Sequence, residues 1–150
     1  VMLQSPVVER FKKNNIRLNI IGDYSKFPQD IIKAIEKLHT ETKDNDALTV
    51  NFALGYGGYD EIVRSVNALL TKGATQITAE MIAGSLDTAG QPNPDLLIRT
   101  GGAQRTSGFL LWQSAYAELY FTDTLWPDFD EKEFDKALED FATRQRRFGK

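Results

Sequence analysis

The feature that most constrains the fold is an alternation between short apolar segments and segments with helical periodicity. Short runs of β-branched and apolar residues predict strands, whereas apolar residues that recur every three or four positions predict amphipathic helices. The expected strands are residues 16–21, 48–53, 95–99 and 118–121. Strands that alternate with helices favour a parallel sheet, because a parallel connection needs a long crossover. We therefore predict an α/β fold with a mostly parallel sheet flanked by helices.

Apolar residues at helical spacing predict which face of each helix packs inward. They are Ile31, Ala34, Ile35 and Leu38 in the first helix; Ile62, Val63, Val66, Leu69 and Leu70 in the second; and Phe134, Ala137, Leu138 and Phe141 in the last. Thr78 predicts the N-cap of a further short helix, and Asp130 with Glu133 predicts the start of the last one. The apolar and aromatic residues 109–116 predict a short buried helix.

Composition limits the classes of function. The 150 residues favour one domain covering residues 1–150. The chain contains no cysteine and one histidine, which excludes disulfides, thiol nucleophiles and zinc-thiolate sites. A formal net charge of −3 argues against a protein that binds nucleic acid through the positive charge of its whole surface. Because no apolar run is long enough to span a bilayer, we expect a cytoplasmic protein.

Residues 99–108 form a glycine-rich segment directly after a predicted strand, at the strand end where open α/β sheets bind ligands. The segment holds Arg99, Arg105 and three glycines. Guanidinium groups bind phosphate oxygens bidentately, and glycines let backbone N–H groups approach an anion. The start of the helix expected at 109–116 would add a positive dipole end. The segment predicts a phosphate or diphosphate cradle, and the alternative is a solvated loop with incidental arginines.

Glu118, at the start of the last predicted strand, is a second candidate site residue. A carboxylate beside a diphosphate can hold Mg²⁺, which combines carboxylate and phosphate oxygens. The alternative is a strand-edge glutamate in an ion pair. The C-terminal residues 144–150 carry four positive charges and no acidic residue. They favour contact with lipid headgroups or with an anion in a partner's site, and the alternative is a disordered terminus.

Longer motifs are spread along the chain. They are residues 17–23, Tyr56-Gly57-Gly58 with Glu61-Ile62, residues 95–102, Arg105 and Ser107 followed by residues 109–116, and then residues 118–123, 125–129 and 146–149. Together these segments resemble the cis-prenyltransferases, and bacterial undecaprenyl diphosphate synthases most closely. The resemblance covers nearly the whole chain from about Val8, and it is too long and specific to arise by chance.

The resemblance implies an activity. The family condenses isopentenyl diphosphate units onto an allylic diphosphate, forms cis double bonds, depends on Mg²⁺ and works as a homodimer with an α/β fold. The same activity is implied here, with farnesyl diphosphate as the allylic substrate, in making undecaprenyl diphosphate for the cell-wall lipid carrier. The partner subunit is expected to cover part of the apolar stretch 109–126, and peripheral membrane contact is expected.

The resemblance also implies roles for individual residues. Arg99, Arg105 and Ser107 would bind the diphosphate of isopentenyl diphosphate, and Glu118 would belong to the Mg²⁺ and diphosphate site. Leu48 would lie near the bottom of the apolar tunnel that houses the growing chain. The terminal Arg147 and Gly149 match an Arg-x-Gly motif that reaches into the partner subunit's active site.

The sequence departs from the family pattern in two ways. The family's N-terminal Asp-Gly-Asn-Gly-Arg-Trp segment, which supplies the Mg²⁺-binding aspartate, has no counterpart, so we expect a C-terminal portion that is inactive alone. Gly55, Tyr59, Ala103 and Gly108 stand where the family usually has Asn, Arg, Glu and Asn. The rival interpretation is a non-catalytic partner subunit or pseudo-enzyme that contributes its C-terminal tail to another subunit's site.

Overall fold

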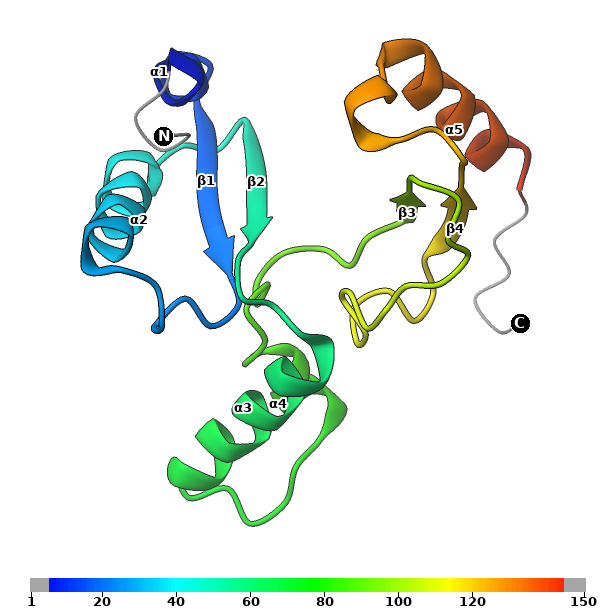
Figure 1. Cartoon of the computed structure of the whole chain (residues 1–150). Coiled ribbons are helices and arrows are strands. Elements are labelled where there is room, and N and C mark those ends of the chain that lie inside the picture. The colour runs from blue at the N-terminus through cyan, green and yellow to red at the C-terminus, as the bar shows by residue number, and fades with distance from the viewer. Residues whose placement is uncertain (1–5, 145–150) are drawn as a thin grey trace. The chain divides into compact units, whose positions relative to one another are not determined.

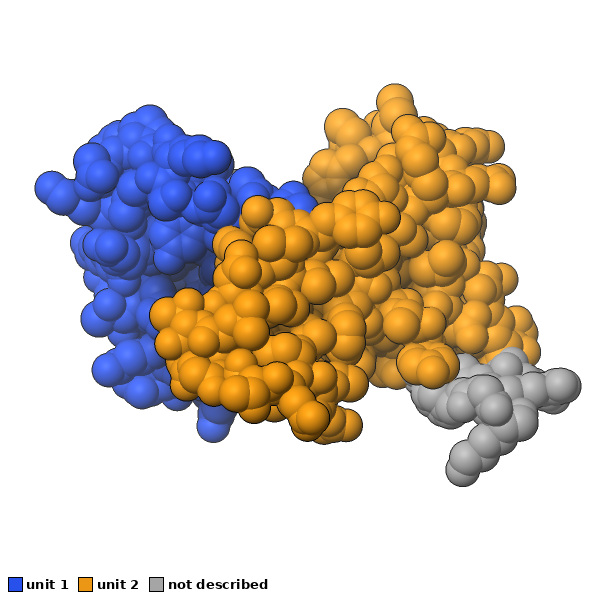
Figure 2. Space-filling view, turned by 90° about the horizontal axis from the view of Figure 1, so that it is seen from below, with its two compact units in different colours: residues 1–57 blue, residues 58–150 orange. Residues whose placement is uncertain are grey.

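The chain folds into two compact units, residues 1–57 and residues 58–150, coloured blue and orange in Figure 2. The computed structural model describes residues 6–144. Each unit contains one two-stranded parallel sheet. The predicted parallel α/β architecture is confirmed, although the described strands form two sheets rather than one, and the single domain stays a prediction. Among the described residues, none of the helices combines the length and apolar character needed to cross a membrane.

The first unit contains four elements, drawn in blue and cyan in Figure 1: α1 (Pro6–Lys13), β1 (Ile16–Ile21), α2 (Gln29–Thr42) and β2 (Leu48–Ala53). β1 and β2 pair in parallel, from Ile16 opposite Leu48 to Ile21 opposite Ala53. Helix α2 supplies the crossover between them and packs on β1. The spacing that predicts α2 also predicts its packing, because Ile35 and Leu38 are buried.

Side chains close the outer edge of β1. Ile21 O accepts a hydrogen bond from Leu54 N, so the alternation of a parallel ladder directs the N–H and C=O of Leu18 away from β2. The hydroxyl of Thr42, which is fully buried at the end of α2, accepts from Leu18 N at 3.1 Å. Asn45 Nδ2 donates to Ile16 O at 2.9 Å. These contacts satisfy the N–H of Leu18 and the C=O of Ile16 on the edge of β1 that faces away from β2.

We expect Thr42→Val to lower the free energy of unfolding by about 1–2 kcal/mol, because it keeps the shape of the side chain and leaves Leu18 N–H buried without an acceptor. Urea unfolding of the two proteins measures the difference. Thr40→Val is the matched control, since the exposed Thr40 hydroxyl contacts just Glu36 O at 2.9 Å, and we expect a change below about 0.5 kcal/mol. Equal effects at the two threonines would contradict this role of Thr42.

The second unit contains α3 (Gly58–Thr71), α4 (Ala79–Ala83), β3 (Leu96–Arg99), β4 (Glu118–Phe121), the 3₁₀ turn η2 (Trp126–Asp128) and α5 (Glu131–Thr143), drawn in green to red in Figure 1. β3 and β4 are parallel, with Leu96 opposite Glu118 and Arg99 opposite Phe121. Both predicted caps are confirmed. Thr78 Oγ1 accepts from Met81 N at 3.3 Å, and Asp130 Oδ1 accepts from Glu133 N at 3.1 Å.

The predicted inner face of α3 is wrong in part. Val63 and Leu70 are 57% and 52% exposed, whereas the fully buried carboxylate of Glu61 and the hydroxyl of Ser65 lie inside. Gly58, Glu61 and Ser65 occupy positions i, i+3 and i+7, which is one helical face. The buried face of this helix is therefore small and polar, and part of its apolar stripe faces solvent.

The buried helix predicted at residues 109–116 is also wrong. This segment runs as a series of turns, and Leu110 has a φ of 47°, which no right-handed helix allows. Phe109 and Tyr116 are 42% and 68% exposed. A helix dipole therefore does not support the preceding glycine-rich loop.

Candidate functional site

The glycine-rich turn after β3 is fixed by hydrogen bonds to the chain that follows β4. Gly101 N donates to Thr124 O and Gly102 N donates to Thr122 O, both at 2.9 Å. A Cβ on Gly102 would come within 2.9 Å of Asp123 Oδ1, so the turn passes close to this segment. The turn thus lies at the carboxyl end of the strand pair, where the sequence predicts the site.

Arg99 holds the loop that begins at this turn. Its Nη1 atom donates to Arg105 O at 2.5 Å and to Ser107 Oγ at 2.9 Å. The structure therefore brings the predicted site residues Arg99 and Ser107 together and places the exposed Arg105 on the same loop. Their role in binding a diphosphate stays a prediction. Within residues 6–144, neither guanidinium has a carboxylate partner. The loop therefore presents two positive charges that no described acidic residue neutralises.

The N-terminus of α3 packs directly against this loop. A Cβ built on Gly58 would lie 2.2 Å from Gly108 O and 2.8 Å from the Cβ of Leu111. Side chains do not approach backbone so closely, so this contact requires glycine at position 58. The sequence motif Tyr56-Gly57-Gly58 contains this glycine but does not reveal its contact with a loop about fifty residues away.

A buried carboxylate holds the far end of the same segment. Glu61 Oε1 accepts from Asp87 N at 2.9 Å, and Gln113 Nε2 lies 3.2 Å from both carboxylate oxygens of Glu61. Gln113 Nε2 also donates to Thr88 Oγ1 at 3.0 Å. Gln113 Oε1 is buried and accepts no hydrogen bond from a described residue. Glu61 thus connects α3 to two separate loops.

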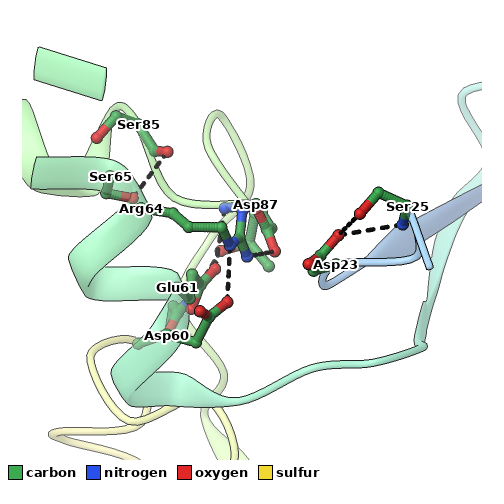
Figure 3. A network of polar contacts seen from close by, with 10 residues as sticks. Asp23, Ser25, Asp60, Glu61, Arg64, Ser65, Ser85 and Asp87 are labelled. Carbon is green, nitrogen blue, oxygen red and sulfur yellow. Dashed lines mark hydrogen bonds and ion pairs between the residues drawn. The ribbon is translucent and has the colours of Figure 1, made fainter. Parts of the chain in front are cut away.

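A guanidinium lies beside this carboxylate in Figure 3. Arg64 donates to both oxygens of Asp87, at 3.1 and 2.8 Å, and its Nε donates to Asp60 at 2.9 Å. These hydrogen bonds, chiefly those to Asp87, raise the pKa of Arg64 above its ordinary value. Ser65 Oγ donates to Ser85 O at 3.0 Å. The network ties the loop at residues 85–88 to α3.

Glu118 lies at the other end of the strand pair. It is opposite Leu96, three positions before Arg99, which corresponds to about 10 Å along a strand. The structure therefore does not bring Glu118 next to the loop of residues 99–108, here called the arginine loop, in its own chain. Glu118 Oε2 accepts from Arg144 Nη1 at 3.0 Å, which is the ion pair that the sequence leaves open as an alternative.

The described residues contain no group of three or more histidines and carboxylates arranged to hold a metal ion. A Mg²⁺ ion needs fewer protein ligands when phosphate oxygens and waters complete its octahedron. The carboxylate of Glu118 is a hard oxygen donor that already balances a cation, the Arg144 guanidinium. Glu118 fits one ligand position of such an ion.

The remaining predicted site residues are not tested by the structure. Leu48 is the first residue of β2 and is 55% exposed, and its role in a tunnel stays a prediction. Arg147 and Gly149 lie outside the described residues. Tyr59 is 76% exposed near the start of α3, and Ala103 is half-buried in the arginine loop.

Comparisons with known proteins agree with one another. The family described as putative undecaprenyl diphosphate synthase matches residues 2–149. An isoprenyl transferase from Neisseria meningitidis is 48% identical over 143 residues, which are 95% of this chain and 58% of that protein. A ditrans,polycis-undecaprenyl-diphosphate synthase, farnesyl-diphosphate specific, from Pasteurella multocida is 47% identical and is covered to 62%.

The structural comparison gives the same result. A probable undecaprenyl diphosphate synthase from Campylobacter jejuni matches 95% of this chain with a TM-score of 0.85 and 40% identity, over 67% of its own length. This chain spans about three fifths of the length of the curated relatives that it matches. The fold, the arginine loop and these matches show that the chain belongs to the undecaprenyl diphosphate synthase family of prenyltransferases.

Proposed function

We propose that this chain is part of a cis-prenyltransferase that condenses isopentenyl diphosphate onto an allylic diphosphate, with farnesyl diphosphate as the primer. The observation that carries the proposal is the pair Arg99 and Arg105, which no carboxylate among the described residues neutralises. The substrates of such an enzyme bear diphosphates, so a loop with excess positive charge at the carboxyl end of a strand has a matching ligand.

Arg99 has a structural and a binding role in this proposal. Its Nη1 supports the loop, and its Nε and Nη2 donate to no described residue. These N–H groups are left for phosphate oxygens, together with the Arg105 guanidinium and the Ser107 hydroxyl. Binding the diphosphate of isopentenyl diphosphate here fixes one end of the molecule and so orients its double bond.

The reaction then joins two carbons. The double bond of isopentenyl diphosphate attacks the carbon that bears the allylic diphosphate, the allylic diphosphate leaves with the bonding electrons, and a proton is lost to restore the double bond. Bound Mg²⁺ would neutralise diphosphate charge. Glu118 is the residue of this chain that we assign to that ion, with the remaining ligands from diphosphate and water.

A homodimer belongs to the same proposal. The segment after the arginine loop exposes large apolar side chains: Phe109 at 42%, Tyr116 at 68%, Leu125 at 60% and Trp126 at 76%. Trp126 and Phe129 stack with ring centroids 6.4 Å apart, so this surface includes an aromatic pair. A second copy covering these side chains would bury apolar surface, and Arg147 and Gly149 would then act across the interface. Peripheral membrane contact and a cytoplasmic location stay predictions.

The binding test uses isothermal titration with isopentenyl diphosphate. Arg105→Ala is expected to weaken binding about 10- to 100-fold, because a charge-assisted hydrogen bond contributes about 1.5–3 kcal/mol. Arg99→Ala should do the same and should also lower the melting temperature, since it removes the hydrogen bonds that hold the loop.

Arg10→Ala is the matched control, because it removes one exposed positive charge from α1. It should leave the affinity within about twofold, since an exposed charge outside the loop is not part of the proposed diphosphate site and is screened by salt. Equal losses for Arg10→Ala and Arg105→Ala would show a general charge effect and would refute a diphosphate site at the loop.

A further inference from the structure

Arg144 occupies the carboxylate that the proposed function assigns to Mg²⁺. It follows the last turn of α5 and donates through Nη1 to Glu118 Oε2 at 3.0 Å. Its Nε and Nη2 lie 2.8 and 2.6 Å from Asp140 Oδ2. One guanidinium thus bridges two carboxylates, on β4 and on α5.

The position of the guanidinium does not depend on Glu118. Asp140 precedes Arg144 by four residues, the spacing that brings side chains together on a helix, and it contributes two of the three contacts. If Glu118 turned away, Arg144 would keep Asp140 as its partner. Breaking the contact between Arg144 and Glu118 therefore leaves no unpaired guanidinium.

The contact is also open to exchange with solvent. The side chains of Arg144 and Glu118 are 31% and 27% exposed. Ion pairs with this much water access are weak compared with buried pairs. Of the two Glu118 oxygens, Oε2 is engaged by Arg144, and Oε1 accepts no hydrogen bond from the described residues.

We propose that Arg144 is the resident counter-cation of Glu118, and that a divalent cation binds this carboxylate by displacing the guanidinium. A metal ion on Glu118 would stand close to a fixed positive charge, and like charges at this separation repel. The ion and Arg144 are therefore alternative partners of one carboxylate. This inference rests on the assignment of Glu118 to the metal site in the proposed function.

The test measures metal binding directly, without an activity assay. Mn²⁺ prefers the same oxygen ligands as Mg²⁺, and electron paramagnetic resonance measures the concentration of the free ion during a titration. Isopentenyl diphosphate is present throughout, because diphosphate oxygens belong to the proposed ligand set, and a titration without protein gives the Mn²⁺ that the diphosphate binds by itself. We expect Arg144→Gln to tighten the Glu118-dependent binding of Mn²⁺ about fivefold, which corresponds to the upper end for a partly exposed ion pair. Arg144→Lys keeps the charge and should stay within about twofold of the wild type.

Two further variants make the result decisive. Arg10→Gln removes one exposed positive charge from α1. An equal tightening in this variant would reduce the effect to net charge and overturn the inference. Glu118→Gln should abolish the binding in question. If Glu118→Gln changes nothing in either background, the metal assignment fails and the inference with it. If Glu118→Gln removes binding but Arg144→Gln does not tighten it, the inference alone fails. Thermal unfolding verifies that each variant is folded.

Discussion

Glu61→Ala is expected to lower the free energy of unfolding by about 3 kcal/mol. The substitution removes the acceptor of Asp87 N–H and of the Gln113 amide in a region where Glu61 is fully buried. Each buried donor left without a partner costs about 1–3 kcal/mol. Chemical denaturation monitored by the fluorescence of the two tryptophans measures the change.

Two other variants separate the loss of the buried hydrogen bonds from the loss of a carboxylate. Glu61→Gln should cost less than Glu61→Ala, because the introduced amide can donate to Gln113 Oε1, the buried acceptor that has no described partner. Asp60→Ala removes a neighbouring carboxylate whose side chain is 59% exposed, and it should cost below about 1 kcal/mol. A Glu61→Ala protein as stable as the Asp60→Ala protein would show that the buried hydrogen bonds contribute little.

Gly58→Ala is expected to disturb both stability and ligand binding. The added methyl would overlap Gly108 O at 2.2 Å, so the loop that carries Ser107 must move. Overpacking of this kind costs about 1–3 kcal/mol. Displacing one charge-assisted contact to the diphosphate should weaken the binding of isopentenyl diphosphate by about tenfold or more. Thermal unfolding and isothermal titration measure the two effects.

Gly84→Ala serves as the control for Gly58→Ala. Gly84 follows α4 with a φ of −73°, and a Cβ there would lie 3.3 Å from its nearest neighbour, Glu80 O. We expect a change in stability below about 0.5 kcal/mol and no change in affinity. If alanine at position 58 were tolerated as well as alanine at 84, the close contact between α3 and the arginine loop would not be needed.

The local sequence pattern was sufficient to predict most helices and strands. It was insufficient for side chains whose positions depend on residues far along the chain. The strands and the caps at Thr78 and Asp130 depend on near neighbours, and these predictions are confirmed. The burial of the Glu61 carboxylate depends on its hydrogen bond with Gln113, which is 52 residues away along the chain. The spacing of Gly58, Glu61 and Ser65 on one helical face was the available signal, but polar residues on an amphipathic helix are ordinarily assigned to solvent.

The candidate site was predictable to a similar degree. Arg99 is the last residue of β3, and Arg105 and Ser107 follow it within eight residues, so sequence proximity alone brings the three together. Glu118 is separated from Arg99 by the length of the strand pair, which residue type does not reveal. Two of the departures from the family pattern are explained by backbone geometry. Gly55 and Gly108 have φ values of 61° and 77°, in the left-handed region that glycine and asparagine adopt most readily.

The closed edge of β1 has a consequence for association and aggregation. A strand edge with unsatisfied N–H and C=O groups recruits strands from other molecules. The contacts of Thr42 and Asn45 with Leu18 and Ile16 occupy part of this edge of β1. A strand that added beside β1 would have to displace these contacts, so intermolecular pairing along the full length of β1 would first require the end of α2 to separate from the sheet.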